Sequence, residues 1–397
     1  MCIFKCVFSI YSLMSPETFS TMERVLYHIR HMSQEERDIL MQHFNLSNEE
    51  QLLNFSGDPE VPIEDFTSFR VHKVLLLYVP PIMVLVGTIG NILSFAVFRT
   101  NSGKVSTYTY LSALAIMDLL VLYVGLLPLW ISQLSGHSIN DHANWTCKMG
   151  AFLGYVCSDS SVWLIVAVTV ERYIAVCFPL KASFLCRIRK AKYIVVVLLL
   201  ILCSLNSHFL WTVQLRHVGN NATAPVYVCD ASPNFSDLVN HVWVWIDAGM
   251  YSFVPFVILL ILNARIVHKV WVAKNERKHI TERRMSTCNA DKSPAGLREA
   301  STKVTVMLLT ISFTFLLTTL PMNVILILTK TWNEQSQRQR ANFHLAKTVS
   351  EILMYLNHTV NFFLYCISGR KFRLQIISSF RNLFHSRTKP IPLNEIK

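Results

Sequence analysis

Residues 74–98 read VLLLYVPPIMVLVGTIGNILSFAVF, a run of 25 residues that contains no Asp, Glu, Lys, Arg or His. An α-helix rises 1.5 Å per residue, so about 20 apolar residues cross the hydrocarbon core of a bilayer. Backbone N–H and C=O groups have no water to bind there, and a helix pairs them within its own segment. The stretch therefore predicts a membrane-spanning helix.

Six further long, mostly apolar runs follow, at 108–132, 149–170, 193–213, 242–268, 304–329 and 345–367. A soluble domain can bury one such helix but not seven. The sequence therefore predicts an all-α membrane protein, in which a seven-transmembrane helix bundle at 73–368 lies between an N-terminal arm at 1–72 and a tail at 369–397. The arm is polar and acidic, which predicts that it is largely disordered.

The composition agrees with a membrane protein. Of the 397 residues, 52% are apolar and 16% are charged, whereas soluble chains carry about 25% charged residues. This apolar content excludes collagen-like and disordered chains, and 10 Cys in such a length exclude a disulfide-stapled miniprotein. The net charge of +12 leaves nucleic acid open as a partner until the charges are placed.

Lys and Arg gather in alternate loops, which predicts the orientation of the chain. The loop at 265–303 has ten basic residues against four acidic ones, and the tail after residue 368 has seven against one. Residues 1–70 have five against eleven, although the loop at 330–347 is an exception with four basic residues. We expect a plasma-membrane protein with its N-terminus extracellular, and the charge pattern gives no support for a nucleic-acid partner.

Glycosylation sequons fall on the predicted outer side. The five candidate sites are Asn45, Asn54, Asn144, Asn221 and Asn234. A sixth match at Asn357 lies within the last span and is interpreted as accidental, because such tripeptides are common.

Polar residues inside the spans carry a free-energy cost of about 2.5–3.5 kcal/mol when they are ionisable, so each needs a reason. The expected cluster consists of Asn91, Asp118, Ser161, Asn357 and Asn361. These side chains either form a pocket for a small cation or form a hydrogen-bonded network that fixes helix packing. The residues alone leave both interpretations open.

Two features bracket the third span. Glu171, Arg172 and Tyr173 lie at its predicted inner end, and Cys147 lies 25 residues before Arg172, roughly 38 Å away along a helix. Cys229 is in the second outer loop, in an oxidising compartment, so a disulfide with Cys147 is expected, and two free thiols are the alternative.

These residues in this order resemble the rhodopsin-like (class A) G-protein-coupled receptors over about residues 73–385. The matching positions are Gly90, Asn91, Leu114, Ala115, Asp118, Cys147, Glu171, Arg172, Tyr173, Cys229, Pro255, Phe315, Pro321, Asn361 and Tyr365. Residues 369–373 resemble the start of the family's short amphipathic eighth helix.

The resemblance assigns roles to these residues. It implies that Glu171 holds Arg172 at rest, that Arg172 faces the G protein when helix six moves outward, and that Tyr365 reorients. It also implies an allosteric sodium ion at Asp118, Ser161, Asn357 and Asn361, with no other cofactor. The expected partners are an extracellular peptide, a heterotrimeric G protein, arrestin and a receptor kinase, with membrane lipid along the basic residues 274–284.

Several positions depart from the family pattern. Thr319 stands in place of the usual Trp of helix six, and Phe362 replaces the proline of the Asn-Pro-x-x-Tyr motif. Without that proline, the last helix is predicted to kink less. A decoy or arrestin-biased peptide receptor is therefore the alternative function. Together these substitutions resemble invertebrate neuropeptide receptors, including the FMRFamide-receptor-like group.

The ligand candidates lie in the outer half of the predicted bundle. Gly154 stands where amine receptors carry an Asp, which argues against a monoamine, and Tyr355 stands where opsins attach retinal. We expect Asp247 and Glu351 to receive a basic group of a neuropeptide, or else to pair with neighbouring side chains. Tyr155 and Tyr355 are candidate aromatic walls, although aromatic residues near span ends also serve as interface anchors.

Other classes find little support in the sequence. No nucleophile–base constellation indicates an enzyme, and no filter-like loop or inverted repeat indicates a channel or transporter.

Overall fold

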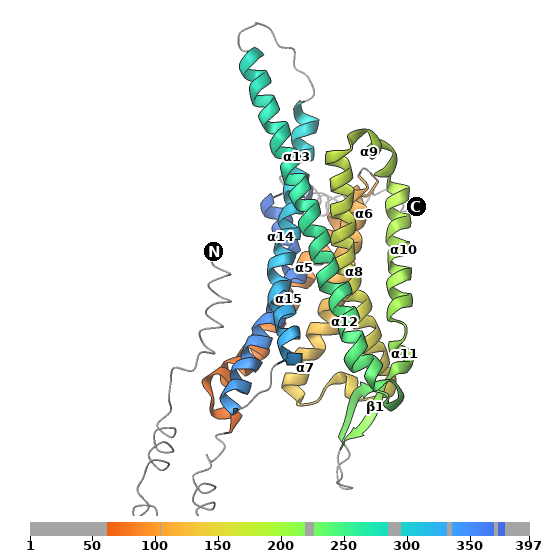
Figure 1. Ribbon diagram of the computed structural model, residues 1–397, viewed down its shortest axis with the longest axis vertical. Helices are drawn as coiled ribbons and strands as arrows, with labels where there is room; N and C mark the ends of the chain where they lie inside the picture. Colours follow the sequence, from red (N-terminus) through yellow and green to blue (C-terminus); the bar gives the residue numbers. More distant parts are fainter. Residues whose placement is uncertain are drawn as a thin grey trace, which may run out of the picture. The chain divides into compact units, whose positions relative to one another are not determined.

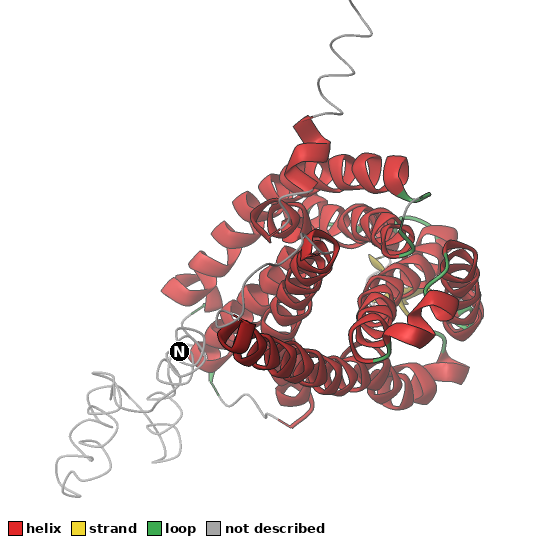
Figure 2. Ribbon diagram, turned by 90° about the horizontal axis from the view of Figure 1, so that it is seen from above, coloured by secondary structure: helices red, strands yellow, loops and turns green. Residues whose placement is uncertain are grey.

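The computed structural model describes residues 62–103, 105–218, 226–284, 295–331, 336–368 and 372–377. Almost all of this part of the chain is helical, with one small sheet (Figures 1 and 2). The long helices are α5 (Thr67–Asn101), α6 (Thr107–Val121), α7 (Leu127–Ser135), α8 (Asn144–Cys177), α10 (Ile188–Asn206), α13 (Val254–Arg284), α14 (Ala295–Thr331) and α15 (Gln337–Ser368). The predicted all-α membrane fold is confirmed.

Shorter elements complete these helices. They are the 3-10 turns η1 (Ile63–Asp65), η3 (Ile139–Asp141) and η4 (Pro233–Phe235), the π-helical segments η2 (Leu122–Leu126), η5 (Leu238–Val242) and η6 (Ala248–Phe253), and the helices α9 (Pro179–Leu185), α11 (Phe209–Thr212) and α12 (Trp243–Asp247).

Six of the predicted spans are helices long and apolar enough to cross a membrane, within the residues that the structure describes. They cover Thr67–Asn101, Thr107–Ser135, Asn144–Cys177, Ile188–Thr212, Leu238–Ala273 and Val306–Thr329. The seventh span lies on α15, a helix of 32 residues. Its polar side chains, among them Asn357, His358 and Asn361, lower its hydropathy, and all three are buried inside the protein.

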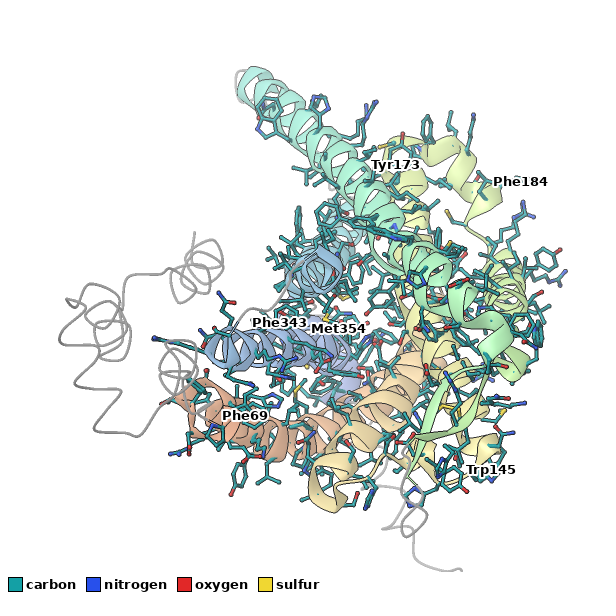
Figure 3. The ribbon with its side chains drawn as sticks, turned by 60° about the horizontal axis from the view of Figure 1, so that its bottom comes forward. Phe69, Trp145, Tyr173, Phe184, Phe343 and Met354 are labelled. Carbon is teal, nitrogen blue, oxygen red and sulfur yellow. A yellow bond between two sulfur atoms is a disulfide. The ribbon has the colours of Figure 1, made fainter. Side chains whose placement is uncertain are left out.

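The chain divides into two compact units. The first contains residues up to Leu75 together with Ile325–Val349. Within it, the His72 Nδ1 atom lies 2.5 Å from Thr348 Oγ1, and the Phe69 and His344 rings meet edge to face at 5.7 Å. Figure 3 labels Phe69 and Phe343 in this unit.

The second unit contains Leu76–Val324 and Ser350–Lys397. Helix α8 is at its centre and packs against α6, α10 and α13 (Figure 1). Trp145 and Tyr173 mark the two ends of α8 in Figure 3. We call the end that carries Cys147 the disulfide end and the end that carries Arg172 the Arg172 end.

Two of the π-helical segments precede a proline. Segment η2 comes just before Pro128, and η6 comes just before Pro255. Proline has no N–H group, so a carbonyl of the preceding turn loses its usual donor. The backbone hydrogen bonds of the helix then change locally from the α to the wider π spacing. In η6, the Trp163 Nε1–H donates to the Met250 carbonyl at 3.1 Å, which satisfies one freed oxygen across to α8.

Some boundaries differ from the prediction. Helix α5 begins at Thr67, so the arm predicted at 1–72 overlaps the first helix, and Arg70 in its first turn pairs with Asp65 at 3.2 Å. The span predicted at 193–213 is interrupted after Asn206, and Val213 already belongs to a strand. Of the predicted eighth helix, the structure describes residues 372–377, which are helical.

Candidate functional site

The disulfide end is covered by a β-hairpin. Strands β1 (Val213–Val218) and β2 (Val226–Ala231) are antiparallel, with Leu215 opposite Cys229. The Cys147–Cys229 disulfide is present, as predicted. In addition, the Cys229 amide donates to Asp141 Oδ1 at 2.7 Å, and the Leu215 amide donates to Asn144 Oδ1 at 3.2 Å. Both strands of the hairpin are therefore attached to the start of α8.

Aromatic rings pack beneath this hairpin. Tyr155 stacks on Phe209 with the ring centroids 4.4 Å apart and meets Trp243 edge to face at 6.5 Å. His208 lies 4.0 Å from the Trp243 ring. Buried Cys147, Phe209 and Trp243 form one apolar cluster. Tyr155 thus belongs to an aromatic layer at the disulfide end.

Two carboxylates lie next to this layer. Asp247 on α12 is half-buried and interacts electrostatically with Tyr155 and with Asp159. Asp159 on α8 is buried, and its Oδ2 accepts from Asn206 Nδ2 at 2.9 Å, while its Oδ1 has no hydrogen-bond partner in the described part of the chain. Asp159 therefore faces α10 through Asn206 and lies near Asp247 of α12.

The other two ligand candidates lie together on α15. Glu351 and Tyr355 are four residues apart and interact electrostatically. The Tyr355 hydroxyl approaches the backbone of Gly125 so closely that a Cβ there would lie 2.7 Å from it. Tyr251 interacts electrostatically with both Asp247 and Tyr355. It therefore lies between the ligand candidates near α12 and those on α15.

A polar cluster lies deep in the second unit around Asp118, which is 0% exposed. Asp118 Oδ1 accepts from Ser161 Oγ at 2.6 Å and contacts His358 Nδ1 at 2.8 Å. Asp118 Oδ2 accepts from Asn361 Nδ2 at 2.7 Å. Asn91 on α5 donates to the backbone carbonyl of His358 at 2.9 Å. Four helices meet in this cluster.

Sodium at Asp118, Ser161, Asn357 and Asn361 stays a prediction: the buried Oδ1 atoms of Asn357 and Asn361 have no hydrogen-bond partner in the described part of the chain, whereas Asp118 is already hydrogen-bonded. A hard cation binds oxygen atoms whose lone pairs converge on one point. Here both oxygens of Asp118 already accept hydrogen bonds, and Asn361 presents its NH₂ group, not its oxygen, to Asp118. Asn357 is buried, but neither atom of its amide has a hydrogen-bond partner in the described part of the chain.

The Arg172 end contains a buried ion pair. Arg172 Nη2 lies 3.1 Å from Glu171 Oε1, and the two side chains are only 10% and 6% exposed. The same Glu171 oxygen accepts from Thr107 Oγ1 at 2.6 Å and from Ser106 Oγ at 3.0 Å. Glu171 is thus fixed by three donors from two parts of the chain. The neighbouring Tyr173 ring meets Phe178 edge to face at 5.7 Å.

Two of the remaining activation candidates, Tyr365 and Phe315, lie in the main apolar core. Tyr365 is 1% exposed, and its ring lies 5.0 Å from Phe98 and 5.4 Å from Phe372 of the short terminal helix. Phe315 is fully buried in the same core. Pro321 lies within α14 and does not end it.

Thr319, which stands where the family carries Trp, bonds within its own helix. Its side chain is 1% exposed, and its hydroxyl donates to the Phe315 carbonyl one turn earlier at 2.7 Å. Helix α14 is nevertheless tied to α8, because Thr169 Oγ1 and Ser312 Oγ lie 3.2 Å apart.

Sequence reasoning missed several of these residues. The most important of them is His358. An ionisable ring inside the last span could have been recognised, because such residues inside a membrane need a partner. Ser106 and Thr107 gave no signal, because hydroxyl residues at a loop-to-helix junction are common.

Asn144 and Asn234 are exposed, as glycosylation requires. Asn45, Asn54 and Asn221 lie outside the described residues.

Known proteins are similar to this chain over most of the helix bundle. The family model described as 7 transmembrane receptor (rhodopsin family) matches residues 90–365. Growth hormone secretagogue receptor type 1 of Homo sapiens is 29% identical over 302 residues, which cover 74% of this chain and 77% of that receptor. The same receptor of Mustela putorius furo is 28% identical over 300 residues, with the same coverage. Thyrotropin-releasing hormone receptor of Ovis aries is 25% identical over 340 residues, which cover 81% of this chain and 80% of that receptor.

Proposed function

Because the chain belongs to the rhodopsin family of seven-transmembrane receptors, whose model spans residues 90–365, we propose that it binds an extracellular neuropeptide and activates a heterotrimeric G protein. Members of this family are multi-pass plasma-membrane receptors and not enzymes. The N-terminus lies outside in this proposal, because the basic residues concentrate in the loops and tail of the opposite side.

The buried Glu171–Arg172 pair is the observation that carries the coupling role. A charged Arg172 side chain that is only 10% exposed is costly unless it is paired, and Glu171 provides that pairing. Outward movement of α14 breaks the Thr169–Ser312 contact and gives Arg172 access to a protein partner. The end of α8 therefore has two arrangements, of which the ion pair stabilises the resting one.

A peptide ligand is supported by the relatives and by the site. Two of the relatives are named as receptors of a secretagogue and of a releasing hormone. These relatives are mammalian receptors, which does not support the narrower resemblance to the invertebrate FMRFamide-like group. We therefore leave the sequence of the peptide unspecified.

Asp247 is the proposed contact for a basic group of the peptide. It lies beside the aromatic layer of Tyr155 and close to Asp159, so two carboxylates reinforce the attraction for one cation. Glu351 and Tyr355 form the second proposed contact, on α15. Asp247→Asn should weaken an Arg-bearing agonist at least about tenfold. The matched control is Asp237→Asn, an exposed acid outside this layer.

Further partners follow from the same proposal. The basic residues 274–284 contact the G protein or anionic lipid. A receptor kinase and arrestin act on the inner loops, where Ser286, Thr287 and Ser293 are candidate phosphorylation sites.

The direct experiment is nucleotide exchange on G proteins in membranes that contain the receptor, screened with a library of amidated peptides. The proposal expects exchange that depends on a peptide and is lost in Arg172→Ala. Ion flux without exchange would contradict the proposed coupling to a G protein. Peptide binding without exchange would favour the decoy or arrestin-biased receptor instead.

A further inference from the structure

The Asp118 cluster is closed by the chain's own side chains. Three donors from two helices meet one carboxylate, and Asp118, Ser161 and His358 are each 0% exposed. A carboxylate buried this deeply needs either a bound cation or several hydrogen-bond donors, because its charge has no access to water. In this protein the donors are present.

His358 is the donor that makes the difference. An ionised carboxylate only accepts hydrogen bonds, so the Nδ1 atom at 2.8 Å from Asp118 Oδ1 carries the hydrogen. The same nitrogen lies 3.3 Å from Ser161 Oγ, so the ring edge sits between the carboxylate and the hydroxyl. A cation that bound both oxygens would have to occupy the space of the ring.

The ring has little freedom to leave. The His358 backbone is held by the Asn91 side chain, whose Nδ2 donates to its carbonyl at 2.9 Å. One turn later, Asn361 donates to the other oxygen of Asp118 at 2.7 Å. Contacts on both sides of His358 thus keep α15 against α5 and α6 and fix where the imidazole lies.

We propose that the imidazole of His358 takes the place of the allosteric sodium ion, so that the resting state of this receptor is built without sodium. The inference rests on the proposed function only where it calls this arrangement the resting state of a receptor. The structural claim does not depend on that function: Asp118 is held by hydrogen bonds from His358, Ser161 and Asn361, and sodium does not bind beside it.

Thermal unfolding of the purified full-length receptor in detergent tests this claim without ligand or G protein. The Tm is compared in sodium chloride and in choline chloride at equal ionic strength. We expect no sodium-specific change for the wild type. In His358→Ser, a small hydroxyl replaces the ring beside Asp118, and sodium should raise the Tm by about 3 °C or more. The double variant with Asp118→Asn should lose that increase.

Each outcome decides the matter. A sodium-specific rise of Tm in the wild type overturns the proposal. Sodium independence in both the wild type and His358→Ser also overturns it, because His358 would then not be what excludes the ion. If His358→Ser yields no folded receptor, His358→Asn is read in the same way, since its amide is smaller than the ring and supplies an oxygen. A receptor that fails to activate any G protein would contradict the proposed function but leave this result standing.

Discussion

Replacing Glu171 with Gln tests whether the buried ion pair at the Arg172 end holds the receptor at rest. The substitution keeps the size of the side chain and removes its charge. The amide oxygen of the variant can still accept a hydrogen bond from Thr107, whose hydroxyl lies 2.6 Å from the present carboxylate. Arg172, only 10% exposed in its side chain, is left without a counter-charge. The resting arrangement should therefore be destabilised, because it is the one that contains the pair.

The expected magnitude follows from the burial of the pair. A hydrogen bond to a charged group contributes about 1.5–3 kcal/mol, and the remaining acceptor keeps the loss near ~2 kcal/mol. Since ~1.4 kcal/mol is a tenfold change in an equilibrium constant, the active-to-resting ratio should rise roughly 30-fold. If about 1% of the wild type is active without ligand, roughly a fifth to a quarter of the variant should be.

The assay is ligand-independent nucleotide exchange on a G protein, in membranes with equal amounts of receptor at the surface. The expected result is basal exchange about 20 times that of the wild type. The matched control is Thr107→Val, which removes one hydrogen bond to Glu171 and leaves both charges. It should raise basal exchange less than Glu171→Gln does, because Ser106 Oγ still donates to the same oxygen at 3.0 Å and both charges of the pair remain.

The reasoning fails if Glu171→Gln leaves basal exchange within about twofold of the wild type while surface expression is equal. It also fails if Thr107→Val has the larger effect of the two, because the hydrogen bond and not the charge would then set the resting state.

The remaining predictions concern stability and topology. Cys229→Ser opens a disulfide that closes 82 residues, so the free energy of unfolding should fall by about 4–5 kcal/mol, and thermal unfolding should show a lower Tm even in non-reducing buffer. Gly90→Ala should destabilise the receptor by about 1–3 kcal/mol, because the new Cβ would lie 2.9 Å from Phe362 Cβ; Phe362→Ala in the same chain should recover part of the loss, which a double-mutant cycle of Tm values measures. Asn144→Gln and Asn234→Gln should each remove one glycan from receptor expressed in eukaryotic cells, seen as faster migration on a gel, and unchanged migration in both would argue against the proposed orientation.

The sequence predicts the bundle because long apolar runs are a local property. A run such as 74–98 forms a helix in a bilayer whatever its neighbours are, since its backbone has no other partners. The Glu171–Arg172 pair is predictable for the same reason, because its partners are adjacent in the chain. The disulfide is predictable from two cysteines in outer segments.

Other features depend on contacts that hydropathy does not encode. A π-helical segment such as η2 changes the path of the second span by one extra residue, yet its residues, Leu122–Leu126, include no charged side chain that would mark the place. Hydropathy also does not show that the fourth span is interrupted after Asn206, because the strand that follows is apolar at its start as well. Likewise, the Asp118 and His358 contact joins positions 240 residues apart. The family resemblance predicts sodium beside Asp118 because it takes into account only the residues at the family's sodium-binding positions. His358 lies between two of these, Asn357 and Asn361, in the sequence.

The residues of α15 that depart from the family pattern support one another structurally. Phe362 stands where the family carries proline, and α15 is an unbroken helix through it. The ring of Phe362 fits because Gly90 on α5 has no side chain at the point of contact. Asn91, the next residue, holds the His358 carbonyl, and the His358 ring holds Asp118. The position of α15 is therefore fixed by packing and hydrogen bonds from α5 and α6, where a proline kink and a bound ion would otherwise set it. In the proposed sodium-free resting state, activation rearranges side-chain contacts along α15, because no ion is released and no proline supplies a hinge at this point.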